Sequence, residues 1–303
     1  MFKDRPNHPD IDRALADLNI RMIWNPALIN ADVIILHNPA FLKFNHSFKP
    51  KMVCDTLVVV THENFTSPSG ALSFDADACL ALIDDATLAA HKILAPVSRY
   101  NRQTVEAWAR DTTSDWIISD TAWSNICDFD QAPPTGAPAD RRGRHSRPGF
   151  EKFPGRAVMD QLFPAHADHN AILGADIFFD DDPPPHWSLF RFREMTVDYF
   201  LESIDFFVYF TNPNWRESFG RVIAEAIAAG KLVLTDPQTA QTFGNGVIGL
   251  APEEVDACIA THVGAPRKYA QAVRTGQKSL GQFSADRFRE RAATILDTAG
   301  GTQ

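Results

Sequence analysis

The sequence predicts an α/β protein built on parallel sheets. Short apolar runs alternate with helix-forming stretches along most of the 303 residues, which is the pattern of strands connected by crossover helices. One stretch rich in proline, glycine and alanine, residues 129–140, interrupts this alternation and predicts a linker. We therefore expect two domains, residues 1–132 and 133–283, with the C-terminal helix 284–303 joining the first domain.

The first half contains four expected strands and three expected helices. The strands are 31–36, 56–60, 91–97 and 115–119, and the helices are 10–18, 76–90 and 99–110. Ser98 stands directly before the third helix, where its hydroxyl can cap the free backbone N–H groups. His37 and His62 each follow a predicted strand. Strands and helices in this order indicate a Rossmann-like parallel sheet.

The alternation restarts after the linker. A basic loop at 141–156 comes first, and an acidic, proline-rich loop lies near 180–185. The expected helices are near 156–162, 196–202 and 219–229, and the expected strands are near 171–174, 205–210, 231–235 and 246–250. The last fifty residues are mainly helical in pattern. The second half therefore also predicts a Rossmann-like domain, and two such domains would form a cleft between them.

The segment 205–230, DFFVYFTNPNWRESFGRVIAEAIAAG, is the most informative part of the chain. A buried strand leads through a polar loop into a helix, which we expect to begin near Phe219 and to end at Gly230. Open α/β sheets bind ligands beyond the carboxyl end of such a strand. The first N–H groups of the helix favour a phosphate, and Gly220 lets the backbone approach it closely.

Two glutamates flank this loop and helix. Glu217 lies at the mouth of the loop and Glu225 lies eight residues further along. Eight helical steps correspond to about 12 Å along the helix axis, which is comparable to the distance between the sugar and the ribose of a nucleotide sugar. The alternative is that Glu225 lies on the surface and that Glu217 only favours the helix dipole.

Basic residues gather in the loop 141–156, although the net charge of the chain is −9. They are Arg141, Arg142, Arg144, Arg147, Lys152 and Arg156, with Glu151 opposing them. Arg144 offers a planar fork for phosphate oxygens and Lys152 offers a compact charge, so both could stabilise a leaving diphosphate. A solvated basic loop is the alternative. The overall acidity argues against general nucleic-acid binding.

Composition and cysteine spacing restrict the remaining possibilities. The hydrophobic content of 45% and the charged content of 22% are those of an ordinary soluble globular protein. Four scattered cysteines show no metal-ligand spacing and favour a reducing cytoplasm, with peripheral contact at the inner membrane left open. The pairs Asp75-Ala-Asp77 and Asp128-Phe-Asp130 match a short metal-binding pattern that arises often by chance, so we expect no metal site.

These segments together resemble the retaining glycosyltransferases of the GT-B fold, group 1, also called glycosyltransferase family 4. The resemblance is carried by ESFGRVIAEAIAAG at 217–230, which contains the Glu-x7-Glu motif of the family, and by GRHSRPGFEKFP at 143–154. It extends to SIDFFVYFTNPNW at 203–215 and FGNGVIGLAPEEV at 243–255. A weaker similarity covers ADVIILHNP and VVVTHENF in the first half.

The resemblance implies a GT-B fold, in which two Rossmann-like domains face a cleft, and it implies roles for individual residues. Glu217 would contact hydroxyls of the donor sugar, and Glu225 the ribose. The diphosphate would be held by Arg144 and Lys152 with nearby residues of the same segments, Gly143, Arg147, Ser218, Phe219 and Gly220. His62 would lie beside the donor sugar, with an ordinary strand-end histidine as the alternative.

The implied activity is retaining transfer of a sugar from a UDP-, GDP- or ADP-sugar to a glycan or lipid-linked glycan. It needs no metal ion, no cofactor and no protein nucleophile. The N-terminal domain is expected to be shortened, because no glycine-rich loop is visible before Ala31 and the first glycine is Gly70. Two alternatives therefore stay open: a nucleotide-sugar-binding module that is inactive without a partner or a missing N-terminal segment, and a GT-B sugar-nucleotide epimerase.

Overall fold

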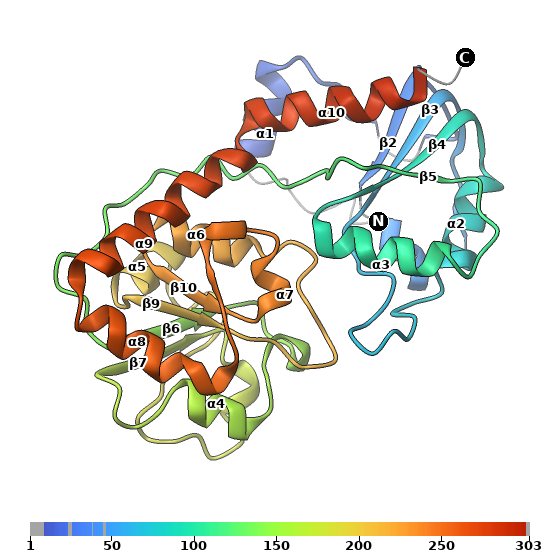
Figure 1. Ribbon diagram of the computed structural model, residues 1–303. Coiled ribbons are helices and arrows are strands. Elements are labelled where there is room, and N and C mark those ends of the chain that lie inside the picture. Colours follow the sequence, from blue (N-terminus) through green and yellow to red (C-terminus); the bar gives the residue numbers. More distant parts are fainter. Residues whose placement is uncertain (1–8, 24–25, 38, 45–46, 301–303) are drawn as a thin grey trace.

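A computed structural model describes residues 9–23, 26–37, 39–44 and 47–300. The chain forms two lobes, each built around a sheet whose paired strands are all parallel (Figure 1). The predicted α/β class with two Rossmann-like domains is confirmed.

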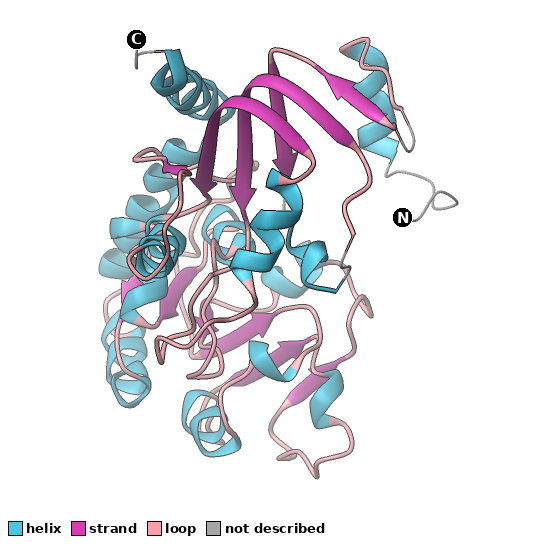
Figure 2. Cartoon of the chain, turned by 90° about the vertical axis from the view of Figure 1, so that its right-hand side faces the viewer, coloured by secondary structure: helices cyan, strands magenta, loops and turns pink. Residues whose placement is uncertain are grey.

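The first domain contains a five-stranded sheet with the order β1-β3-β4-β5, in which β2 also pairs with β3. Its strands are β1 (Leu28–Asn30), β2 (Val33–His37), β3 (Lys51–Thr61), β4 (Thr87–Pro96) and β5 (Ile117–Ile118), and its helices are α1 (Pro9–Asp17), η1 (Pro39–Phe44), α2 (Ala76–Asp84) and α3 (Arg99–Ala109). The strands of this sheet point toward the second domain (Figure 2). The loops that follow them therefore face that domain.

One helix prediction in the first domain is wrong. The helix expected over 76–90 ends at Asp84, and β4 begins only three residues later at Thr87. Leu88 pairs in the sheet with Val53, so tertiary pairing overrides the helix-forming composition of this stretch. The cap prediction is confirmed, because the Ser98 hydroxyl accepts a hydrogen bond from the backbone N–H of Asn101.

The second domain contains a six-stranded sheet with the order β11-β10-β9-β6-β7-β8. Its strands are β6 (Arg141–His145), β7 (His169–Leu173), β8 (Ser188–Phe190), β9 (Phe206–Tyr209), β10 (Leu232–Thr235) and β11 (Ile248–Gly249). The chain adds β7 and β8 on one side of β6, and later β9, β10 and β11 on the other. The order therefore reverses between β6 and β9, and such switch points hold ligands at the carboxyl ends of their strands.

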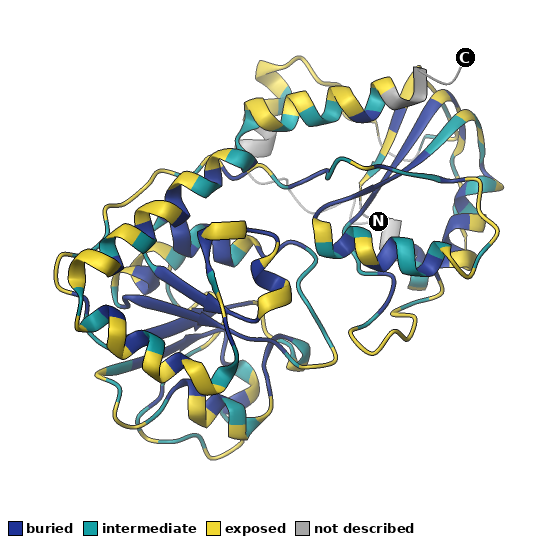
Figure 3. Cartoon of the chain, in the orientation of Figure 1, coloured by how far each residue is buried: buried dark blue, intermediate teal, exposed yellow. Residues whose placement is uncertain are grey.

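Helices cover the second sheet, except for the last one, which continues to the first domain. The α-helices are α4 (Arg156–Leu162), α5 (Val197–Glu202), α6 (Arg221–Ala228), α7 (Pro237–Ala240), α8 (Val255–Val263), α9 (Pro266–Ser279) and α10 (Ala285–Gly300). Short 3-10 turns are η2 (Phe150–Lys152), η3 (Asp176–Phe178), η4 (Gly244–Gly246), η5 (Pro252–Glu254) and η6 (Leu280–Phe283). The central strands are buried and the outer faces of the helices are exposed (Figure 3).

The basic loop expected over 141–156 begins with a central strand instead. Arg141–His145 forms β6, which pairs with β7 and β9. Its arginines are tolerated there because each finds partners: Arg141 pairs with Asp205, and Arg142 pairs with Asp140 and Asp256. The third arginine of the strand, Arg144, donates to backbone carbonyl oxygens instead. Buried charged groups need such pairs or hydrogen bonds, and the sequence pattern does not reveal these partners.

The C-terminal helix and the interdomain segment connect the two lobes. Helix α10 runs from the second domain to the first (Figure 1), where the Phe288 ring packs edge-on against Trp123 and Ile295 is buried. The backbone of Ala132 packs against Gly230, whose positive φ of 75° ends α6. A side chain at position 230 would come within 2.7 Å of the Ala132 carbonyl oxygen.

Candidate active site

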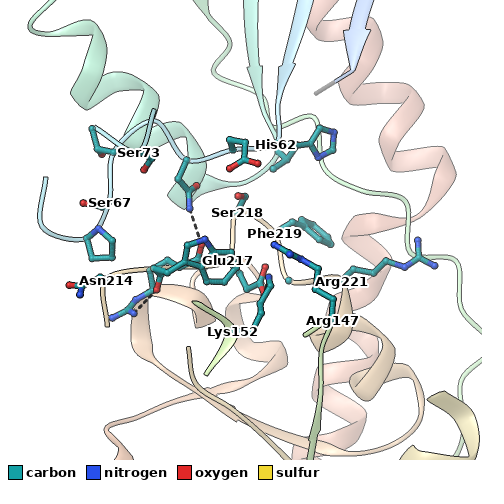
Figure 4. A pocket seen from close by; sticks show the side chains of 18 of the residues that line it. His62, Ser67, Ser73, Arg147, Lys152, Asn214, Glu217, Ser218, Phe219 and Arg221 are labelled. Atoms are coloured by element: carbon teal, nitrogen blue, oxygen red, sulfur yellow. Dashed lines mark hydrogen bonds and ion pairs between the residues drawn. The ribbon is translucent and has the colours of Figure 1, made fainter. Parts of the chain in front are cut away.

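A cleft of 460 Å³ lies between the two domains, at the carboxyl ends of strands from both sheets (Figure 4). The first domain contributes the loop after β3, including His62, Asn64 and Ser67. The second domain contributes the loops that follow β6 and β9, which flank the switch point of its sheet. Both halves of the chain therefore build one site.

A lysine–glutamate pair forms the centre of the second-domain wall. The Nζ atom of Lys152 lies 2.7 Å from Oε1 of Glu217, which also accepts a hydrogen bond from the Tyr209 hydroxyl. Only 10% of the Lys152 side chain and 13% of the Glu217 side chain are exposed. The ammonium group also lies 3.8 Å from the centre of the Trp215 ring, a favourable cation–π contact.

This environment affects the titration of both donors. Burial lowers the pKa of Lys152, while the Glu217 carboxylate acts in the opposite direction. Burial also raises the pKa of Tyr209 well above its ordinary value, so the phenol stays protonated and donates to Glu217. Because two donors share one carboxylate oxygen, the direction of the Glu217 side chain is well determined.

Arg144 lies beneath the cleft wall and does not line it. Its side chain is fully buried, between the rings of Phe153 and Tyr209 at 4.2 and 4.8 Å from the ring centres. The guanidinium donates to the carbonyl oxygens of Phe210 and Lys152. Burial lowers the pKa of Arg144 to about 10, so it stays charged at neutral pH. The structure thus places Arg144 where it supports the Lys152 segment.

Gly143 is also placed away from the cleft. A Cβ atom at this position would lie 2.7 Å from a side-chain methyl group of Ile204 and 3.0 Å from the Phe200 ring. The missing side chain therefore allows close packing of β6 against the helix side of the sheet. Gly143 and Arg144 were both predicted at the diphosphate, and neither belongs to the lining of this cleft.

Glu225 lies within α6 and is not among the residues that line the cleft. Its Oε1 is 2.9 Å from Nε of Arg221, and its Oε2 is 3.8 Å from Nε2 of His145. Burial, together with the neighbouring Arg144, lowers the pKa of His145 to about 4, so this imidazole is neutral at pH 7. Its Nε2 has no hydrogen-bond partner among the described residues. Arg221 lines the cleft and thus connects it with Glu225.

The helix at the site begins two residues later than predicted. Gly220 is the N-cap of α6, with φ of 90°, and no side chain caps the helix. This left-handed conformation favours glycine and leaves the first N–H groups of α6 directed beyond the helix end. Ser218, Phe219 and Gly220 all line the cleft, while the Phe219 ring packs against Phe243.

The first-domain wall carries a histidine pair. Nε2 of His62 lies 2.9 Å from Nδ1 of His37. Burial lowers the pKa of His62 to about 4 and lowers that of His37 as well. Both rings are therefore neutral at pH 7, and one donates to the other. His62 lines the cleft, and one of its ring nitrogens is hydrogen-bonded to His37.

Several lining residues were not expected from the sequence. They include Lys43, Asn64, Ser67, Ser73, Trp215, Arg216 and Arg221. Arg221 comes directly after the Glu-x-Phe-Gly part of the motif, and Asn64 lies two positions after His62. Their closeness in sequence to predicted site residues could therefore have identified these two residues as candidates. Arg147, which was expected, lines the cleft with 62% of its side chain exposed and lies 3.0 Å from Glu151.

Three of the four aspartates in the short Asp-x-Asp pairs have structural roles. Asp75 caps α2, Asp77 accepts from the indole of Trp108, and Asp128 accepts from the backbone of Ala285. No group of three or more potential metal-ligating side chains occurs among the residues that the structure describes. In the same part of the chain, no helix is long and apolar enough to cross a membrane.

Two Rossmann-like domains that face each other across such a cleft define the GT-B fold, and this chain has that fold. The sequence matches no known family model, and no curated protein is detectably similar to it in sequence. Its fold is similar to that of several solved structures.

Three solved structures illustrate this similarity. The Anabaena protein HepE, in complex with UDP and glucose, is 16% identical, with a TM-score of 0.58 over 80% of this chain and 72% of that chain. The α,α-trehalose-6-phosphate synthase of Burkholderia multivorans is 12% identical, with a TM-score of 0.54 over 95% and 73% of the two chains. An α-glucosyltransferase in complex with UDP-glucose and DNA is 12% identical, with a TM-score of 0.51 over 95% and 84%. At these identities the similarity establishes the fold.

Proposed function

We propose that the protein is a retaining glycosyltransferase of family 4, which moves a sugar from a nucleoside-diphosphate sugar to a glycan acceptor. The observation that carries the proposal is the buried Lys152–Glu217 pair in the interdomain cleft. A cation that could bind phosphate, next to an acceptor that could bind sugar hydroxyls, would suit the junction between the two parts of a nucleotide sugar, and this supports the proposal.

The diphosphate would be neutralised by cations of the second domain. Lys152, Arg147 and Arg221 line the cleft, and so does Gly220, the N-cap of α6. Negative charge develops on the diphosphate as the glycosidic bond breaks, and cations already in place stabilise it. Arg144 would contribute indirectly, because it holds the Lys152 and Phe210 carbonyl oxygens.

The sugar and the ribose would bind the two glutamates. The Oε2 atom of Glu217 could accept hydrogen bonds from hydroxyls of the donor sugar, because Lys152 and Tyr209 both contact Oε1. Glu225 pairs with Arg221 on α6, and we propose that the nucleoside extends along this side of the helix. In the proposed same-face reaction, the leaving phosphate helps to remove the proton from the acceptor hydroxyl. The protein supplies no nucleophile.

UDP-sugars are the first donors to test, because the HepE and α-glucosyltransferase structures contain UDP or UDP-glucose. The acceptor is proposed to be a glycan or a lipid-linked glycan in polysaccharide synthesis, in the cytoplasm. Lysine and arginine side chains can neutralise the diphosphate by themselves. We therefore expect no cofactor, and transfer should persist within about twofold after treatment with EDTA.

Calorimetric titration with UDP-, GDP- and ADP-sugars, followed by transfer assays with a panel of glycans, tests the proposal. We expect sugars linked to one of the three nucleotides to bind. Glu217→Ala should abolish the part of the binding affinity that the sugar contributes. The product should retain the anomeric configuration of the donor sugar. No binding by any nucleotide sugar would refute the proposal. Donor binding without transfer or hydrolysis would indicate a binding module, and a changed sugar nucleotide without acceptor would indicate an epimerase.

A further inference from the structure

Two side chains of the first domain bind the loop of the second domain that carries Glu217. The Nδ2 atom of Asn64 donates to the carbonyl oxygen of Arg216 at 3.0 Å. The hydroxyl of Ser98, at the N-cap of α3, donates to the carbonyl oxygen of Ser218. The Arg216 carbonyl belongs to the peptide directly before the Cα atom of Glu217, and the Ser218 carbonyl belongs to the second peptide after it. The first domain therefore holds the backbone on both sides of Glu217.

Both donors are held by Asn101, a side chain with no exposed surface. Its Nδ2 donates to Oδ1 of Asn64 at 3.1 Å and to the carbonyl oxygen of Glu63 at 2.8 Å. Its backbone N–H donates to the Ser98 hydroxyl at 3.1 Å. Its Oδ1 accepts from Thr61 at 2.8 Å and from the Val97 backbone at 3.2 Å. The position of Asn101 thus determines where both cross-domain donors point.

We infer that Asn101, Asn64 and Ser98 form an interdomain relay that positions Glu217, so that the donor site is complete only when the first domain is docked on the loop. The inference rests on the proposed function for the meaning of "donor site". The side chain of Glu217 is held by Lys152 and Tyr209 of the second domain. The carbonyl groups of its two neighbours, Arg216 and Ser218, are held by the first domain. The residue is therefore the point at which the two domains are coupled.

This arrangement has a consequence for the order of events. A ligand that binds Glu217 in its observed orientation binds the docked arrangement better than an undocked one, and so it shifts the population toward docking. The coupling is reciprocal, because docking then raises the affinity for the same ligand. Through the relay, recognition of the sugar would depend on the first domain, whereas binding of the nucleotide would not.

Two substitutions remove the donors while keeping the contacts inside the first domain. Asn64→Asp retains an oxygen that can accept from Asn101 but loses the N–H group that binds Arg216. Ser98→Asp retains an acceptor for the N-cap of α3 but loses the hydroxyl donor. Ser98→Thr keeps both the cap and the hydroxyl and is the matched control.

Hydrogen–deuterium exchange of the ligand-free full chain is the direct test. We expect amides in residues 212–220 to exchange at least about fivefold faster in Asn64→Asp and Ser98→Asp than in the wild type, since local opening of the loop becomes easier. Amides of β9 and α6, and the loop in Ser98→Thr, should be unchanged. Wild-type exchange of the loop in both aspartate variants would overturn the inference.

Kinetics give a second readout. We expect kcat to fall about tenfold in each aspartate variant while the affinity for UDP without a sugar stays within twofold, because the phosphate cations belong to the second domain. An equal loss of affinity for UDP and for the UDP-sugar would contradict a role that acts through Glu217. If the wild type showed no transfer but the loop exchange changed as expected, the relay would stand and the proposed function would fall.

Discussion

The two walls of the cleft differ in chemistry, although both are formed by loops at the carboxyl ends of parallel strands. The second-domain wall carries Lys152, Glu217, Arg147 and Arg221. The first-domain wall carries mainly neutral polar groups, such as the hydroxyls and amide of Asn64, Thr66, Ser67 and Ser73, and the neutral His62. Its charged residues, Lys43 and Glu63, pair with each other at 3.3 Å.

This difference indicates which part of a ligand each wall would bind. A wall of cations suits the charged part of a ligand, whereas neutral donors and acceptors suit hydroxyl groups, which need hydrogen bonds and no net charge. We therefore expect substitutions in the second wall to change phosphate-dependent binding. Substitutions in the first wall should change the response to the sugar and the acceptor.

The largest effect is expected from Glu217→Ala. The substitution removes the acceptor of the Lys152 and Tyr209 bonds together with the proposed sugar contact, and we expect kcat to fall by about 100-fold or more. Initial rates at saturating donor measure the effect. Glu253→Ala, which changes an exposed glutamate in η5, is the control. Wild-type turnover in Glu217→Ala would contradict the assignment of the site.

The next largest effects are expected from Arg144 and Lys152, two basic residues for which the sequence predicts the same role at the diphosphate. Arg144→Met should leave two buried carbonyl oxygens without their donors, at a cost of about 1–3 kcal/mol each in the free energy of unfolding. Lys152→Met should weaken UDP binding by about tenfold or more, because a cation at the phosphate is lost.

Urea unfolding and calorimetry on the same two variants separate these effects. The comparison predicts a stability loss that is larger in Arg144→Met and a UDP affinity loss that is larger in Lys152→Met. The reverse order would mean that Arg144 reaches the ligand, as the sequence alone suggested.

A smaller effect is expected from the two exposed arginines of the second wall. Arg147 and Arg221 have 62% and 60% of their side chains exposed, so solvent and salt screen their charges. We expect Arg147→Gln and Arg221→Gln each to weaken UDP binding by about two- to fivefold, and less at high salt. Titrations at two salt concentrations measure this. An effect that does not depend on salt would argue against a phosphate contact.

The last effect concerns stability rather than binding, and depends on pH through His145. Its folded pKa of about 4 lies below the ordinary unfolded value, so between about pH 6.5 and pH 4 the unfolded chain binds more protons. Stability should therefore fall as the pH falls through this window. His145→Gln should reduce this slope by up to about 1.4 kcal/mol per pH unit, measured by urea unfolding. Equal slopes would contradict a neutral, buried imidazole.

Local patterns in the sequence predicted much of the second domain. The strand, loop and helix of 205–230 appear within two residues of their expected bounds, because apolar runs and the glycine after the helix act over a few neighbouring positions. The capping serine at 98 was predicted for the same reason. The alternation of strands and helices also determined the fold class, since parallel strands need crossover connections.

The tertiary structure decided which charged groups face the cleft. Arg144 and Lys152 are eight residues apart, and only packing distinguishes the buried guanidinium from the ammonium at the cleft. The partners of Glu217 and of its loop are distant in the chain, with separations of 65 residues for Lys152–Glu217, 120 for Ser98–Ser218 and 152 for Asn64–Arg216. Hydrogen bonds over such separations depend on how the two sheets are placed in space, and no local pattern in the sequence encodes that placement.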